Sequence, residues 1–165
     1  MGARREATDE EIKVLASTLR MRILRVCLHE PRTNKEIAGI LGRDPASTLH
    51  HVRRLVDTGF LATQEERRGT RGSREIPYLA TRKSWTLSTP VGDRVLLDTF
   101  LEEAGQVGVD ELHTSRLGLR LSPQRWAEFQ ERLTDLLDEY AADPSDPSGQ
   151  AWSVFLALHP DPNQR

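Results

Sequence analysis

TNKEIAGILGRDPASTLHHVRRLVDTGFL, residues 33–61, is the stretch that decides the fold. It predicts two short helices joined by a tight turn and followed by the apolar start of a strand. Thr33 and Glu36 form a capping box, because each side chain can accept a hydrogen bond from the other residue's backbone N–H. Gly42 is expected to end the first helix, since glycine tolerates a left-handed backbone.

The second helix is expected to begin at Asp44 and Pro45, a side-chain acceptor followed by a residue with a helical φ. Leu49, Val52 and Val56 follow at helical spacing and are predicted to face a core. The polar side chains then lie on the outer surfaces: Ser47, Thr48, His50, His51, Arg53 and Arg54. Such a surface of hydroxyl, imidazole and guanidinium groups, with no carboxylate before position 57, suits a DNA major groove.

A hairpin rich in arginine is predicted next. Residues 60–67 and 74–81 have the composition of two strands, and the sequence RGTRGS lies at their tip. Glycine allows a close approach to the DNA backbone, and arginine supplies charge for phosphates or the minor groove. An exposed hairpin without a ligand is the alternative, since Glu65, Glu66 and Glu75 flank the tip. The candidate contacts are Arg67, Arg68, Arg71 and Arg74.

ASTLHHVRRLVDTGFL (46–61), RRGTRG (67–72) and YLAT (78–81) together resemble the recognition helix and wing of the ArsR-type winged-helix transcription regulators. The resemblance covers roughly residues 8–88. It implies a homodimer that represses by occluding a promoter, with a dimer interface on the helix after the wing, near residues 90–104. The chain lacks that family's cysteine-rich metal motif, because TNKEIAGIL contains neither cysteine nor histidine. We therefore expect no metal site and no cofactor.

Charge is divided unevenly along the 165 residues. Residues 1–90 hold 17 Lys and Arg against 11 Asp and Glu, whereas residues 91–165 hold 6 against 14. A basic half joined to an acidic half is typical of a DNA-binding domain linked to another module. No apolar run is long enough to span a membrane, and the single cysteine fits a reducing compartment, so a cytoplasmic protein is expected.

The last third of the chain predicts a strand–helix–strand module. Residues 117–121 alternate leucine with glycine and arginine, Ser122 and Pro123 begin a long helix, and the apolar residues 151–159 form a second strand. Two strands alone are marginally stable, so the module is expected to extend its sheet or to pack with a second chain. The predicted fold is α+β and mainly helical: a winged helix-turn-helix domain at 1–88 and a dimerisation or effector module at 89–165.

The candidate site therefore combines helix, turn and wing. Ser47, Thr48, His51 and Arg54, at offsets 0, +1, +4 and +7, are expected to share one exposed face, with His50 beside it. Thr33 and Asn34 are expected to meet a phosphate. The expected partners are double-stranded DNA, a second copy of the chain on a pseudo-palindromic site, and as a further candidate a small-molecule effector.

Several alternatives stay open. A winged helix can also serve as a protein–protein interaction module or bind nucleic acid without sequence preference. Cys27 is either a core residue or a redox sensor, and Trp126 and Trp152 are either core anchors or the lining of a small-molecule pocket. No phosphate loop, nucleophile elbow or HExxH motif is present, so an enzyme is not expected.

Overall fold

A computed structural model describes residues 4–69, 74–88, 92–143, 146 and 148–163. The contacts of the described residues divide them into two units, 4–106 and 107–163. We describe each unit by itself. The fold is α+β and mainly helical, as the sequence predicts.

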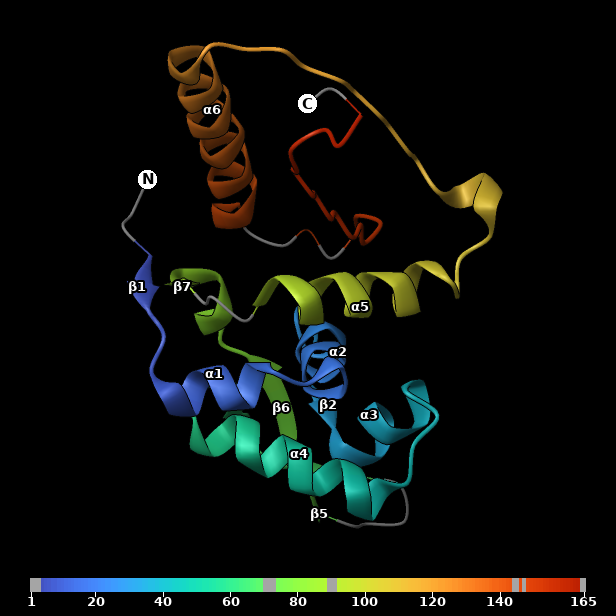
Figure 1. The fold of residues 1–165 in the computed structure, drawn as a ribbon. Helices are drawn as coiled ribbons and strands as arrows, with labels where there is room; N and C mark the ends of the chain where they lie inside the picture. Colours follow the sequence, from blue (N-terminus) through green and yellow to red (C-terminus); the bar gives the residue numbers. More distant parts are fainter. Residues whose placement is uncertain (1–3, 70–73, 89–91, 144–145, 147, 164–165) are drawn as a thin grey trace. The chain divides into compact units, whose positions relative to one another are not determined.

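The described residues of the first unit form five α-helices, which Figure 1 labels. They are α1 (Asp9–Leu15), α2 (Thr18–Val26), α3 (Asn34–Ile40), α4 (Pro45–Asp57) and α5 (Gly92–Ala104). The predicted capping box at Thr33 is present, a second capping box occurs at Thr8, and Asp44 accepts from the backbone N–H of Ser47 at the start of α4. Local side-chain acceptors therefore set where these helices begin. None of the described helices is long and apolar enough to cross a membrane.

Short strands complete the winged helix. β6 (Pro77–Ala80) lies between β2 (Arg32–Thr33) and β3 (Leu61–Thr63) in an antiparallel sheet, with Leu61 opposite Ala80. β4 (Arg67–Arg68) and β5 (Arg74–Glu75) form the antiparallel wing. β1 (Arg5–Glu6) pairs in parallel with β7 (Leu87–Ser88), which follows a short 3-10 helix at Lys83–Thr86. The predicted helix-turn-helix and wing are therefore confirmed.

One hydrophobic core joins these elements. Helices α1, α2, α3 and α4 each contribute a buried face. Leu61 of β3 and Leu87 of β7 complete the core. Phe60 directly follows the turn after α4 and is 1% exposed. The other most deeply buried apolar side chains are Val14, Ile23, Cys27, Ile37, Val52, Leu55 and Leu61.

Helix α5 belongs by its contacts to the winged-helix unit, whereas the sequence analysis placed it in the second half of the chain. It packs on α2, as Figure 1 also shows. Arg22 and Arg25 of α2 form ion pairs with Glu102 and Glu103 of α5 at 3.3 and 2.8 Å. Thr99, which faces this contact region, is 4% exposed. The sequence could not reveal this packing because it joins elements some 80 residues apart.

The second unit confirms the predicted long helix and corrects the predicted strands. Helix α6 (Pro123–Ala142) begins at the N-cap Ser122, as expected. Residues 112–121 and 150–161 form no strand, although the sequence alternation predicts one in each (Figure 1). A strand needs a hydrogen-bonded neighbour, and the described part of this unit contains no strand ladder. The strand–helix–strand module is therefore not formed within this chain.

Candidate nucleic-acid interface

The helix-turn-helix is held by polar contacts between α3 and α4. The Asn34 side-chain amide, at the start of α3, donates to the backbone carbonyl of Pro45 at 2.8 Å. Gly42, in the turn, has a φ of +60°, a left-handed conformation that glycine adopts without strain. The hydrogen bond joins the starts of the two helices, and the glycine conformation allows the tight turn between them.

The buried face of α4 differs from the predicted one. Thr48, Val52 and Leu55 are each 0% exposed, whereas Leu49 and Val56 are only half-buried. The Thr48 hydroxyl donates to the carbonyl of Asp44 at 2.8 Å, which satisfies the hydroxyl inside the helix and allows burial. The prediction that Thr48 lies on the outer surface is therefore wrong, because the core-facing stripe runs through Leu55.

The solvent-facing side of α4 carries four of the predicted residues. Ser47, His50, Arg53 and Arg54 are all exposed, and no carboxylate occurs on α4 before Asp57. Offsets of +3 and +7 from Ser47 place His50 and Arg54 on one stripe, with Arg53 beside it. This stripe, which we call the α4 surface, offers a hydroxyl, an imidazole and two guanidiniums.

Arg54 already has an acidic partner in this structure. Its guanidinium lies 3.1 Å from a carboxylate oxygen of Glu10 on α1, and the Arg54 side chain remains 44% exposed. An ion pair this exposed contributes little to stability. A phosphate or base can therefore compete for Arg54.

His51 lies between the surface and the core. The residue is half-buried, and its Nδ1 atom has no hydrogen-bond partner among the described residues. Burial, and then the charges of Arg20 and His50, lower the pKa of His51 below its usual value. His51 therefore lies only partly on the exposed face that its spacing predicts.

Thr33 is occupied by its own helix. It is 4% exposed, its hydroxyl accepts from the backbone N–H of Glu36, and its backbone N–H donates to the Glu36 carboxylate at 2.7 Å. The backbone N–H of Thr33 is the main reason why the pKa of Glu36 is lowered. The Thr33 side chain is therefore buried in its own capping box, and the predicted phosphate contact at this helix N-terminus stays a prediction.

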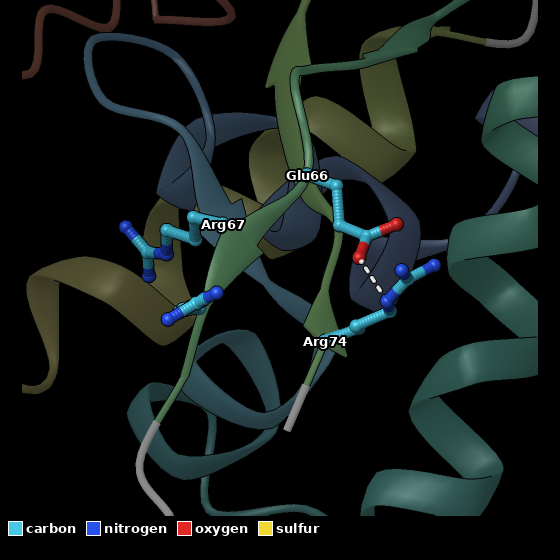
Figure 2. A pocket seen from close by; sticks show the side chains of 4 residues that line it. Glu66, Arg67 and Arg74 are labelled. Carbon is cyan, nitrogen blue, oxygen red and sulfur yellow. Dashed lines mark ion pairs between the residues drawn. The ribbon is translucent and has the colours of Figure 1, made fainter. Parts of the chain in front are cut away.

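The side chains of Arg67 and Arg74 lie on opposite sides of the wing (Figure 2). Arg74 forms an ion pair with Glu66 at 3.1 Å, whereas Arg67 points to the other side of the hairpin, where it lies 2.6 Å from Glu36. A shallow depression in the wing is lined by Glu66, Arg67, Arg68 and Arg74. The Arg68 side chain is exposed. The candidate Arg71 lies outside the described residues.

Two exposed cations that the sequence analysis did not select lie on the helix-turn-helix itself. Lys35 is in the first turn of α3, and Arg43 is in the turn before α4. The signal that could have identified them is a positive charge beside a helix start, Lys35 at the start of α3 and Arg43 just before α4, since such residues often contact phosphates.

The C-terminal end of α4 is anchored by a buried carboxylate. Lys83 donates from Nζ to the Thr58 carbonyl at 2.7 Å and lies 2.7 Å from Glu11. Glu11, only 8% exposed in its side chain, also accepts two hydrogen bonds from Arg5 and one from the backbone of Thr8. Arg5, then Lys83 and Thr8, lower the pKa of Glu11 far below its usual value. This network connects α1 to the end of α4.

Nothing in the described residues forms a metal centre, because no three His, Cys, Asp or Glu side chains converge. Cys27 is 0% exposed, and burial raises the pKa of its thiol to about 12. This environment matches the core interpretation of Cys27 and not a redox sensor, which needs an accessible thiolate. Trp126 and Trp152 are 36% and 62% exposed, so the core-anchor interpretation of these two residues is not supported.

Comparisons with known proteins complete the description. No family model and no curated protein sequence matches the chain. Among solved structures, reduced HlyU from Vibrio cholerae is 21% identical, covers 55% of this chain and 82% of its own, and has a TM-score of 0.37.

Two further structures are similar at the same level. The homodimeric winged helix-turn-helix domain Mb0332 from Mycobacterium bovis, described as a possible ArsR-family regulator, is 18% identical over 63% of this chain and 82% of its own, with a TM-score of 0.37. ZitR from Lactococcus lactis in complex with DNA is 18% identical over 75% of both chains, with a TM-score of 0.35. At these scores the similarity carries no inference about function, and the winged helix-turn-helix is identified by the geometry of Arg4–Gln106.

Proposed function

We propose that this chain is a sequence-specific DNA-binding transcription regulator that acts as a homodimeric repressor on a pseudo-palindromic site. The single observation that carries the proposal is the α4 surface. It presents Ser47, His50, Arg53 and Arg54 to solvent without a carboxylate among them. Arginine pairs bidentately with guanine, and serine can bond to base edges or phosphates, so this surface has the chemistry of major-groove recognition.

Phosphate contacts would surround the α4 surface. Lys35 and Arg43 lie on the helix-turn-helix, and Arg68 and Arg74 lie on the wing. Cations at these two places can neutralise the DNA backbone on both sides of an inserted helix. They would position α4 without specifying sequence.

Two copies are needed for useful specificity. One inserted helix contacts only a few base pairs, and paired half-sites about one helical turn apart multiply the discrimination. Repression by occluding a promoter follows from the ArsR-type resemblance. A small-molecule effector would then act on residues 107–163 or on the dimer contact.

The proposal is tested by selecting bound sequences from a random DNA pool with the full chain, followed by titration on the selected site. Arg53→Ala and Arg54→Ala should each weaken binding by about 1–3 kcal/mol if the residue contacts a base. Arg94→Ala is the matched control, because Arg94 is exposed on α5 and pairs with Asp98. A two-fold symmetric site with losses confined to the α4 variants supports the proposal. Equal affinity for all sequences would instead indicate a nonspecific binder.

A protein–protein interaction module is the second candidate, and one observation favours it. Three of the predicted DNA-contacting arginines are paired with acids: Arg54 with Glu10, Arg67 with Glu36 and Arg74 with Glu66. These pairs reduce the positive potential of the helix-turn-helix and wing. The absence of any binding to DNA at low salt would favour this candidate.

A further inference from the structure

The second unit exposes two extended segments with a regular apolar alternation. In the segment 113–121, Leu117, Leu119 and Leu121 are 75%, 46% and 38% exposed. In the segment 151–159, the exposed apolar side chains occupy every second position: Trp152, Val154, Leu156 and Leu158. Alternation of this kind is typical of a strand with one covered face, yet neither segment is in a sheet.

The exposed apolar area is as large as a stable dimer requires. Helix α6 adds Trp126, Leu136 and Tyr140 to the seven residues of the two segments. Weighting each of these side chains by its exposed fraction, with about 170 Å² for a complete large side chain, gives roughly 900 Å². A standard interface buries about 800 Å² on each partner.

The segment 151–159 has the features of a pairing edge. Its sequence, AWSVFLALH, contains no lysine, aspartate, glutamate, arginine or proline, the residues with which monomeric proteins protect an edge strand. The segment 113–121 is less suitable, since Arg116 and Arg120 would repel their own copies and Gly118 weakens a strand.

The two segments also begin side by side. The rings of His113 and Trp152 have centroids 5.5 Å apart, which brings the first residues of both segments together in one chain. A helix connects them, so their topology is that of a parallel strand–helix–strand unit. Such a unit leaves the outer edge of 151–159 available to another strand.

We propose that the segment 151–159 pairs antiparallel with the same segment of a second copy of this chain, forming an intermolecular sheet whose apolar face is buried, together with the exposed side chains of α6, between the two copies. An antiparallel pair of identical segments is two-fold symmetric, which is the symmetry that a closed dimer requires. Pairing supplies the segment 151–159 with the neighbouring strand that no sheet among the described residues gives it. This inference adds a second dimer contact to the one that the ArsR-type resemblance implies near residues 90–104, and it rests on the proposed homodimer.

The test combines oligomeric state with amide hydrogen exchange of the full chain at several concentrations. We expect a dimer in sedimentation velocity, and protection of amides 151–159 that decreases on dilution together with the dimer. A monomer at all concentrations would overturn the inference, with the apolar surface then covered within one chain. Protection that does not depend on concentration would overturn it as well.

A pair of variants sharpens the result. Leu156→Lys places a charge on the apolar face and should raise the dimer dissociation constant at least tenfold. Ser153→Thr changes the opposite face of the strand without adding a charge to the edge and should leave that constant within about twofold. A Leu156→Lys protein that dimerises like the wild type overturns the inference. If this variant loses helical ellipticity, the dilution series on the wild-type chain decides.

The outcome is separable from that of the proposed function. A dimer through 151–159 that enriches no DNA sequence would refute the regulator and leave this interface in place. A protein that binds a symmetric site but dimerises without this segment would refute the interface alone.

Discussion

Glu11→Gln is the perturbation that best examines how α4 is held in place. The wild-type carboxylate, 8% exposed, accepts hydrogen bonds from Arg5 at 2.8 and 3.0 Å and lies 2.7 Å from Lys83. Glutamine keeps the shape and one oxygen, so the backbone N–H of Thr8 retains an acceptor. The substitution removes the negative charge that Arg5 and Lys83 share, and both of these cations are partly exposed.

The expected cost is about 2 kcal/mol at pH 7, since one hydrogen bond to a charged group contributes about 1.5–3 kcal/mol. The pKa of Glu11 is lower in the folded than in the unfolded chain, where it is near 4.5. The stabilisation by the carboxylate is therefore fully present above the unfolded-state pKa and is lost as pH falls toward the folded-state pKa. The difference in the free energy of unfolding between the two proteins should therefore begin to decrease below about pH 4.5 and continue to decrease as the pH falls further.

Urea unfolding of both proteins between pH 3 and 7, followed by helical ellipticity, measures the difference in the free energy of unfolding. An NMR titration of the Glu11 carboxyl carbon measures its pKa directly. A stability difference that does not change with pH, or a titration midpoint near 4.5, would refute the account of Glu11 as a charged anchor. Glu6→Gln, on the exposed strand β1, is the control that should change stability little.

Three further predictions follow from single side chains. Thr48→Val should lower the free energy of unfolding by about 1 kcal/mol, because the hydrogen bond to the Asp44 carbonyl is lost. The affinity for the selected DNA should not change. Weaker DNA binding at equal stability would place Thr48 in the interface. Gly59→Ala should cost about 1 kcal/mol in thermal unfolding, because φ at Gly59 is +74°, and an unchanged melting temperature would contradict this strain. Cys27 should resist a thiol-specific reagent in the native protein and react after unfolding in urea; rapid native labelling would contradict its burial.

Local chemistry made much of the first unit predictable. The capping boxes at Thr8 and Thr33 and the cap at Asp44 join residues three apart, so the sequence specifies both partners of each hydrogen bond. The wing was predictable from the strand-like composition of residues 60–67 and 74–81 and from the glycine-rich sequence between them. The helix α6 was predictable from Ser122 and Pro123 and from its apolar spacing.

The orientation of α4 was not determined by its own pattern. Two sets of residues have the spacing of a buried helix face: Leu49, Val52 and Val56, or Thr48, Val52 and Leu55. The two faces differ by a rotation of the helix about its axis. The surrounding core selects the second set, which buries Thr48 and half-buries His51. Hydrophobic pattern alone cannot choose, because threonine becomes burial-competent only when its hydroxyl bonds within the helix.

The sequence by itself determined the helix starts, the helix-turn-helix, the wing and a basic solvent-facing side of α4. Only the tertiary structure decided that Arg54 meets Glu10, that Arg67 meets Glu36, that Lys83 joins Glu11 to the end of α4, and that α5 belongs with α2. It also decided that the alternating segments after residue 112 stay without a ladder in one chain. The physical reason is range: caps and periodicity act within a few residues, whereas ion pairs, helix packing and strand pairing depend on segments brought together by the fold.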